Sequence, residues 1–311
     1  MGRVSIRWRC WSAAWHDFRR KLAPLCGYCG CVHAASMWRR MRRRSCGVRM
    51  QGARYCQSEC LELALLEAFA KARPVSRRAT IATHRIPLGL LLLSRQQLTA
   101  AQLRTALDAQ RSAGRSQPQR KIGAWLQELG FATEHQITAA LARQWSCPML
   151  RTGSAAMGAS RFLPIPVLLL ESFQMMPVEL VEATGRLLVA FSEDVDYTVL
   201  LAIEQMLGYH TEACLVCPST LQENLQILAR HRGANDVVFD RVKDTAECAH
   251  IIGSYAAKVG AQEVRLARCG GYTWIRLERL RQEAVNLLLQ VPAQIPAAVP
   301  VTAAAAAASA L

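Results

Sequence analysis

Four cysteines are spaced as two pairs that could bind one metal ion. Cys26 and Cys29 are separated by two residues, and Gly30 follows the pair. Cys56 and Cys60 form a second pair, whose spacing is one residue longer than the commoner form. Two thiolates at such spacing can direct both sulfurs at one ion, and a glycine relieves the turn that brings them together. The spacing therefore predicts a zinc site made of these four cysteines.

Local patterns place the four cysteines in a zinc-binding module over residues 25–74. Val48–Met50 and Ala53–Tyr55 flank Gln51 and Gly52 as in a short hairpin, and a helix is expected over residues 61–71. The second cysteine pair opens this helix, where the helix N-terminus favours thiolate. This order of elements is typical of a treble-clef-like module. The alternative ligands are Cys31, His33 and Cys46, and the alternative to a metal site is a set of buried or incidental thiols.

The positive charge of the chain is concentrated near its start. Residues 1–80 carry 17 of the 38 lysines and arginines but only four of the 23 acidic residues, so most of the formal net charge of +15 lies there. A basic aromatic segment, residues 1–24, holds three tryptophans, and residues 39–44 hold five arginines. Arginines can neutralise phosphates and indoles can stack on unpaired bases, so residues 1–60 could bind nucleic acid. An acidic protein or an anionic membrane surface is the alternative partner.

The cellular setting follows from the first residues and from the cysteines. The opening residues lack the apolar stretch of a secretory signal peptide. We therefore expect a cytoplasmic protein, because a reducing compartment favours metal binding by thiols over disulfides. The long uncharged stretch near the end of the chain is interrupted by Pro292, Pro296 and Pro300, so no transmembrane segment is expected.

A repeat of 34 residues is the most informative feature of the sequence. Its matched positions are Leu88 and Ile122, Gly89 and Gly123, Leu92 and Leu126, Thr99 and Thr133, Gln102 and Gln136, Leu103 and Ile137, Ala106 and Ala140, Leu107 and Leu141, and Gln110 and Gln144. Each copy predicts a short apolar helix, a turn and a second helix. The threonines are placed to cap the second helices, each with a glutamine three residues later to close a capping box. Two helical hairpins with matching apolar stripes should pack together.

The second copy reads Lys-Ile-Gly-x-x-Leu-x-x-x-Gly-Phe-Ala-Thr-x-x-Gln-Ile-x-x-Ala-Leu-Ala-x-Gln over residues 121–144. It resembles the repeated motif in the N-terminal domain of type II secretion and type IV pilus assembly ATPases, the group of GspE, PilB and MshE. The resemblance continues through residues 144–150 and 180–228 and covers roughly residues 86–230. It implies a tandem helical repeat over residues 86–150, then an α/β subdomain over residues 151–230, with no catalysis of its own.

The resemblance also implies a ligand. In MshE-like members the doubled motif is a receptor for cyclic di-GMP, in which an arginine and a glutamine of each copy contact guanine. The residues carried over are Leu88, Gly89, Leu92, Leu103, Leu107 and Gln110 in the first copy and Lys121, Gly123, Leu126, Gly130, Leu141 and Gln144 in the second. Lys121 and Pro87 stand where the arginines belong, Gln96 replaces a glycine, and Arg85 lies two residues upstream of Pro87. The alternative is that glycines and leucines at these spacings serve only helix packing.

The ATPase motor of that group is missing from this sequence. No Gly-x-x-x-x-Gly-Lys-(Ser/Thr) loop exists, and no glycine is followed by lysine, so the usual phosphate cradle is absent. The histidines at 84, 135, 210, 231 and 250 occur singly. We therefore expect no enzyme. The expected function is a cytoplasmic sensor or adaptor, a regulator in protein transport that binds a protein partner of a secretion or pilus machinery. The alternative is a zinc-containing regulator that binds nucleic acid.

The rest of the chain predicts a basic linker over residues 75–85, a small α/β unit over residues 236–290 and a disordered Ala/Pro tail over residues 291–311. Within the α/β unit we expect a strand near Val237, a helix capped by Asp244 and Glu247, and a hairpin at Gly270 and Gly271. Tyr272 and Trp274 could form a partner-binding face, although strand aromatics commonly pack a core. The expected fold class is α+β.

Overall fold

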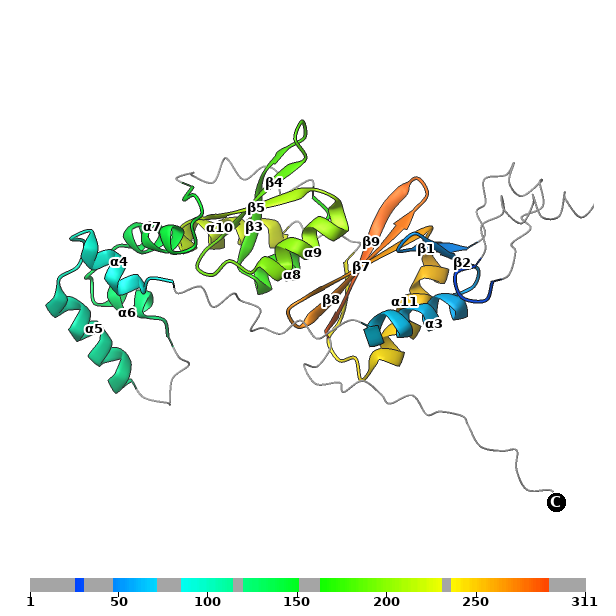
Figure 1. Ribbon diagram of the computed structural model, residues 1–311, viewed down its shortest axis with the longest axis horizontal. Coiled ribbons are helices and arrows are strands. Elements are labelled where there is room, and N and C mark those ends of the chain that lie inside the picture. The colour runs from blue at the N-terminus through cyan, green and yellow to red at the C-terminus, as the bar shows by residue number, and fades with distance from the viewer. Residues whose placement is uncertain are drawn as a thin grey trace, which may run out of the picture.

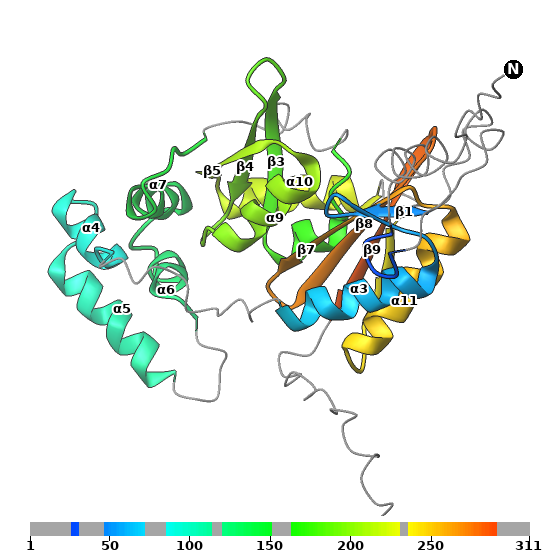
Figure 2. The same ribbon diagram turned by 45° about the vertical axis from the view of Figure 1, so that its right-hand side comes forward.

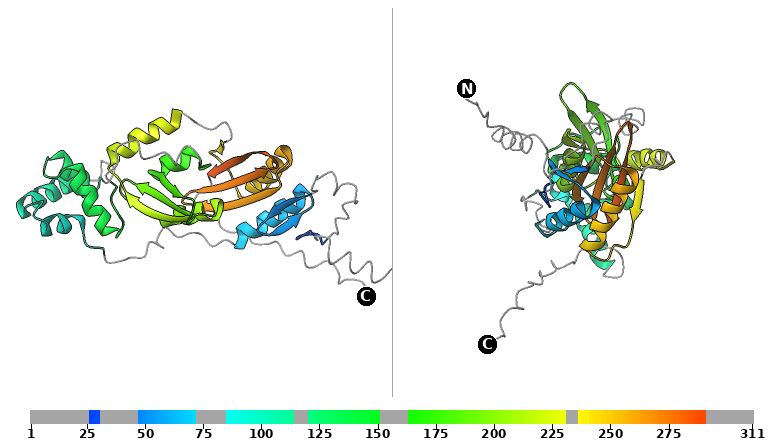
Figure 3. Two further views of the ribbon diagram at one scale, coloured as in Figure 1. Left: turned by 90° about the horizontal axis from the view of Figure 1, so that it is seen from above. Right: turned by 90° about the vertical axis from the view of Figure 1, so that its right-hand side faces the viewer.

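A computed structural model describes residues 26–30, 47–71, 85–113, 120–150, 163–230 and 236–290. The basic aromatic segment, residues 31–46, the basic linker up to residue 84 and the Ala/Pro tail lie outside the described residues. The described elements are helices and mixed sheets, so the α+β class is confirmed. They lie in a row, with the helical repeat at one end and the largest sheet toward the other (Figure 1, Figure 3).

The helical repeat contains four helices. They are α4 (Leu88–Ser94), α5 (Ala100–Ser112), α6 (Ile122–Glu128) and α7 (Glu134–Gln144). Both expected capping boxes are present, because Thr99 and Thr133 each accept a hydrogen bond from the amide of the glutamine three residues later. Across the two copies, α4 packs against α7 and α5 packs against α6. Each helix of one hairpin therefore packs against a helix of the other, and their leucines share one small core.

Both repeat glycines have a packing reason. A Cβ at Gly89 would lie 2.7 Å from Cδ1 of Leu103, and a Cβ at Gly123 would lie 3.2 Å from Cγ2 of Ile137. Leu103 and Ile137 are matched positions of the repeat, so both copies use the same close approach between their two helices. The departure from the motif at Gln96 leaves the turn unchanged, because Gln96 (φ 58°) adopts the same left-handed conformation as Gly130 (φ 69°).

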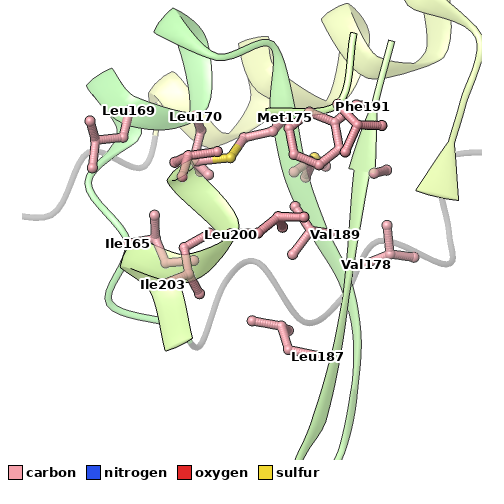
Figure 4. Packing of buried hydrophobic residues seen from close by; sticks show 14 of the residues in the cluster. Ile165, Leu169, Leu170, Met175, Val178, Leu187, Val189, Phe191, Leu200 and Ile203 are labelled. Carbon is pink, nitrogen blue, oxygen red and sulfur yellow. The ribbon is translucent and has the colours of Figure 1, made fainter. Parts of the chain in front are cut away.

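An α/β subdomain follows the repeat. Its elements are α8 (Val167–Ser172), β3 (Met175–Val181), β4 (Arg186–Phe191), α9 (Tyr197–Leu207), β5 (His210–Leu215) and α10 (Pro218–Arg230). The sheet order is β3-β4-β5, antiparallel in the first pair and parallel in the second. Asp196 caps α9, and Gly208 ends it in a left-handed conformation. Figure 4 shows the core between this sheet and its helices, where Met175, Leu187 and Phe191 are fully buried.

The third part of the fold joins segments from distant parts of the chain. Its elements are β1 (Val48–Met50), β2 (Ala53–Tyr55), α3 (Ser58–Lys71), β6 (Asp236–Phe239), α11 (Thr245–Val259), β7 (Glu263–Cys269), β8 (Tyr272–Arg279) and β9 (Gln282–Gln290). They form a six-stranded sheet in the order β2-β1-β7-β8-β9-β6, with α3 beside α11 (Figure 2). We call this unit the composite domain. The cysteine-bearing segment and the C-terminal α/β segment thus share one sheet.

The two faces of this sheet pack against different helices. Val264, Ile275 and Leu287 point into a core with α3 and α11. Trp274 and Leu288 belong instead to the core that contains α9. Trp274 is fully buried, and its indole N–H donates a hydrogen bond to Oδ1 of Asn286 at 3.2 Å. The expectation that Trp274 forms a partner-binding face is therefore wrong, and its alternative role in the core is confirmed.

Candidate functional sites

The four predicted cysteines come together in space. The sulfurs of Cys26, Cys29, Cys56 and Cys60 all lie within 4.8 Å of one another. Two of the distances are 3.6 Å, from Cys29 to Cys56, and 3.5 Å, from Cys56 to Cys60. Zn–S bonds of about 2.3 Å in a tetrahedron place the sulfurs about 3.8 Å apart. The cluster therefore has the ligand number and nearly the spacing of a tetrathiolate zinc site.

Three local structures position these sulfurs. Cys26 pairs with Arg54 of β2 in an isolated bridge, and the amide of Gly27 donates to the carbonyl of Arg54 at 2.8 Å. Gly30 has a φ of 65°, as the turn after the first pair requires. Cys56 directly follows β2, and Cys60 lies in the first turn of α3. The alternative ligands Cys31, His33 and Cys46 lie outside the described residues.

The thiols of the cluster influence one another's pKa values. Burial raises the pKa of Cys56 and of Cys60, and hydrogen bonds with neighbouring thiols raise the pKa of Cys56 further. Burial also acts to raise the pKa of Cys26, but hydrogen bonds led by the backbone amides of Cys29 and Tyr28 outweigh it and lower that pKa to about 6. A bound cation would favour the thiolate form at all four positions.

The glutamines that end the two repeat copies bind the opposite copy. Nε2 of Gln144 donates to the carbonyl of Ile86 at 2.7 Å, and Nε2 of Gln110 donates to the carbonyl of Arg120 at 2.7 Å. Ile86 and Arg120 are themselves matched positions of the repeat, just before the start of α4 and α6. The two candidate ligand positions are therefore equivalent, and residues of both copies build each one.

The leucines and glycines expected around the ligand are mostly buried. Leu88, Gly89, Leu92, Gly123 and Leu126 are buried, whereas Leu103, Leu107 and Leu141 are half-buried. Gly130 is exposed at the turn after α6. The buried members pack against the other helices of the repeat, which accounts for their residue types without a ligand.

Lys121, the expected ligand-binding cation of the second copy, already pairs with two carboxylates. Its Nζ lies 2.8 Å from Oε2 of Glu193 and 2.5 Å from Oδ2 of Asp194, in the loop after β4. Burial acts to lower the pKa of Lys121, but the two acidic partners outweigh it and raise that pKa. In the first copy, Arg85 places its guanidinium carbon 3.3 Å from the ring centroid of Trp145.

Sequence reasoning missed the residues that attach the second copy to the α/β subdomain. Glu134 accepts hydrogen bonds from the amide of Ser219 at 2.7 Å and from its hydroxyl at 2.8 Å, at the start of α10. Glu134 and Lys121 are matched in the first copy by Ala100 and Pro87, neither of which can make such contacts. The difference between the copies at these two positions is a signal that could have indicated the attachment.

The features that suggested a nucleic-acid partner fall mostly outside the described residues. Trp8, Trp11 and Trp15 do so, as does the arginine run over residues 39–44. Cys214 is buried in β5 and Cys217 is half-buried beyond that strand, and neither belongs to the four-cysteine cluster. Among the described helices, none is both long and apolar enough to cross a bilayer.

Known proteins are similar to part of this chain. No family model matches the sequence, and no curated protein matches it. A solved structure described as "Structure of MshE with cdg" is 26% identical, with a TM-score of 0.36, over 46% of this chain and 99% of that chain. Two crystal forms of the N-terminal domain of XpsE are 18% and 20% identical, with TM-scores of 0.32 and 0.27, over 45% and 50% of this chain and 91% and 97% of those chains. About half of this chain is thus similar to nearly the whole of the MshE and XpsE chains in those structures.

Proposed function

We propose that the protein is a non-catalytic sensor and adaptor whose helical repeat binds cyclic di-GMP. The observation that carries the proposal is the reciprocal placement of Gln110 and Gln144, which creates two equivalent positions at the seam between the copies. A ligand with two guanines fits a site with two equivalent halves. The motif resemblance assigns these same glutamines to guanine. The missing phosphate loop supports a role without ATP hydrolysis of the kind that the motor of that group performs.

Binding would require local rearrangement. Gln110 and Gln144 would have to exchange a backbone carbonyl for a base edge, and Lys121 would have to leave Glu193 and Asp194. Lys121 is the residue that also attaches the second copy to the α/β subdomain. Ligand binding would therefore alter this attachment, which is how a non-catalytic receptor could pass a signal to its neighbour.

The test is a titration of the full chain with labelled cyclic di-GMP. We expect saturable binding at micromolar concentration or below, weakened at least about tenfold by Gln144→Ala, which would lose the implied contact with guanine. Lys121→Ala should also weaken binding. Gln127→Ala is the matched control, because this glutamine is exposed on α6 away from the seam. No saturation at high micromolar ligand would leave the repeat as a packing scaffold and would overturn the proposal.

The adaptor role requires a surface for a protein partner of a secretion or pilus machinery, which we place on α9. Tyr197 and Leu201 lie one helical turn apart on α9 and are 52% and 57% exposed, and the Tyr197 ring lies 6.3 Å from that of Trp145. Leu201→Asp should abolish capture of a specific partner from native cells, and added cyclic di-GMP should change the amount captured by the wild type. Ile227→Asp, at a partly exposed apolar position of α10, is the control.

We also propose that the four-cysteine cluster binds one structural zinc ion in a cytoplasmic protein. Four sulfur ligands leave no open position, so the ion would have no catalytic water. A reducing compartment keeps the thiols free to bind metal. Metal analysis of untagged protein should give about one zinc per chain, lost in Cys60→Ser and retained in Cys217→Ser, whose cysteine lies outside the cluster. An unchanged zinc content in Cys60→Ser would overturn the assignment.

A further inference from the structure

The segment that carries the four cysteines has no core of its own. Its buried apolar side chains form one cluster with those of α11 and β7–β9. These side chains, on β1 and α3, are Met50, Leu61, Leu65 and Phe69. Residues 26–30 and 47–71 contain only two three-residue strands and one helix. Segments this small rarely fold without a metal or a partner surface. This segment has a partner surface in α11 and β7–β9, and its four cysteines are the proposed metal site.

The backbone of the segment is joined to the C-terminal part of the chain. β1 pairs in parallel with β7, with Arg49 opposite Glu263, and the amide of Arg49 donates to the carbonyl of Gln262 at 2.8 Å. β1 also pairs with β2, which ends beside the cysteines. The sheet therefore connects the cysteine cluster to β7 through two neighbouring strands.

The helices make a second connection. α3 and α11 approach so closely that a Cβ at Gly253 would lie 2.5 Å from Cγ of Glu62. Nδ1 of His250 on α11 lies 3.4 Å from Oε2 of the same glutamate. Near the other end of α3, the guanidinium carbon of Arg268 lies 5.3 Å from the ring centroid of Phe69. α3 thus contacts α11, and β7 near its C-terminal end, while its first turn supplies Cys60.

We infer that zinc binding by the four cysteines controls the assembly of the composite domain, so that β1 and α3 hold α11 and β7 only while the metal is bound. The inference rests on the proposed zinc site. The ion fixes the Cys26–Gly30 turn, the end of β2 and the start of α3 relative to one another. Without it, only the pairing of Cys26 and Gly27 with Arg54 and the short link between β2 and α3 align these three pieces. The loss of their alignment then frees α3 and β1 from the C-terminal segment.

The test is hydrogen exchange of the full chain, with zinc bound and after removal by a chelator under reducing conditions. We expect exchange in α11 and β7 to rise at least about tenfold on zinc removal, while exchange in α4–α7 stays unchanged, because the repeat has its own core. Restoring zinc should restore protection. Zinc bound at one per chain with unchanged exchange in α11 and β7 would overturn the inference and leave the zinc site standing. Absence of zinc would overturn both, independently of cyclic di-GMP binding.

A variant remote from the sulfurs tests the same coupling in reverse. Gly253→Val should displace the Glu62 side chain of α3 from its contact with α11 without touching a cysteine of the cluster, and coupling between two sites is reciprocal. We expect the zinc affinity, measured by competition with a chromophoric chelator, to fall at least about threefold. Ala257→Val is the control, because it places the same side chain at an exposed position of α11. Equal zinc affinity in Gly253→Val and the wild type would overturn the inference.

Discussion

The side chain of Gln144, at the end of the second repeat copy, donates a hydrogen bond to the carbonyl of Ile86, just before the first copy begins. Gln110 makes the matching bond to Arg120 at the same distance of 2.7 Å. In each bond, the glutamine at the end of one copy reaches the backbone just before the first helix of the other copy. The two copies are therefore related by an approximate two-fold symmetry. This relation places the two glutamines at equivalent positions of the seam between the copies.

Removal of either glutamine should destabilise the repeat. Gln110→Ala and Gln144→Ala each delete one exposed hydrogen bond between the copies, so we expect a loss of about 1 kcal/mol each in the opening free energy of α4–α7, measured by hydrogen exchange. Gln127→Ala, at an exposed position of α6, should cost less than about 0.5 kcal/mol. A loss in Gln127→Ala as large as in the other two variants would contradict the role of the seam.

Neutralising the carboxylates beside Lys121 should strengthen ligand binding. Glu193→Gln combined with Asp194→Asn removes two negative charges that hold Lys121 and repel an anionic ligand. We expect the affinity for cyclic di-GMP to rise about three- to tenfold at low salt, with a smaller gain at high salt because of screening. Asp108→Asn, on the solvent side of α5, is the control, and weaker binding in the double variant would contradict the prediction.

Two glycines of the β1–β2 hairpin should respond differently to alanine. Gly47 has a φ of 103°, and a Cβ there would lie 2.5 Å from the carbonyl oxygen of Tyr55. Because that neighbour is backbone and cannot rotate away, Gly47→Ala should cost more than about 2 kcal/mol of stability. Gly52, at the turn with a φ of 82°, has open space around it, so Gly52→Ala should cost only about 1 kcal/mol. Thermal unfolding of both variants would check this difference, and equal melting temperatures would contradict it.

Glu204 should make stability depend on pH. The hydrogen bond from the amide of Thr211, at 2.8 Å, is the main cause that lowers the pKa of Glu204 from its ordinary value of 4.5; burial opposes it, and the Thr211 hydroxyl and His210 assist. A carboxyl whose pKa is lower in the folded state stabilises the fold above its ordinary pKa, and this contribution is lost as the pH falls through the lowered value.

Glu204→Gln should therefore be less stable than the wild type by about 1 kcal/mol at pH 7. The difference should shrink steadily below about pH 4.5. Urea unfolding of both proteins at pH 7 and pH 3 would measure it. Glu223→Gln, at an exposed position of α10, should show no comparable change with pH. A difference between wild type and Glu204→Gln that stays constant with pH would rule out the ionised carboxylate as its cause.

Local features of the sequence were sufficient to predict many elements. The capping pair at Asp244 and Glu247 predicts α11, and Gly270 and Gly271 predict the β7–β8 hairpin. The cysteine spacing predicts which four sulfurs meet. Each prediction depends on residues close in the chain, where turn and cap chemistry decides the conformation.

Features that depend on distant residues were not predictable in this way. β9 reads as the start of a long uncharged stretch, and only its pairing with β8 and β6 defines it as a central strand. The pairing of β1 with β7 has no local signal, because three residues of β1 fit many partners. The motif suggests that Lys121 binds a ligand. Its ion pairs with Glu193 and Asp194 were not predictable, because that acidic loop lies far along the sequence.

The parallel pairing of β1 with β7 also has a consequence for biosynthesis. The ribosome releases β1 and α3 before residues 85–230. Strand β7 and helix α11, which pack against them, are made only after residue 230. During translation, Leu61 and Leu65 therefore lack their final partners while the helical repeat completes its own core. Non-local contacts of this kind form late and slowly, so the composite domain should be the last part of the nascent chain to fold and the part most dependent on a chaperone.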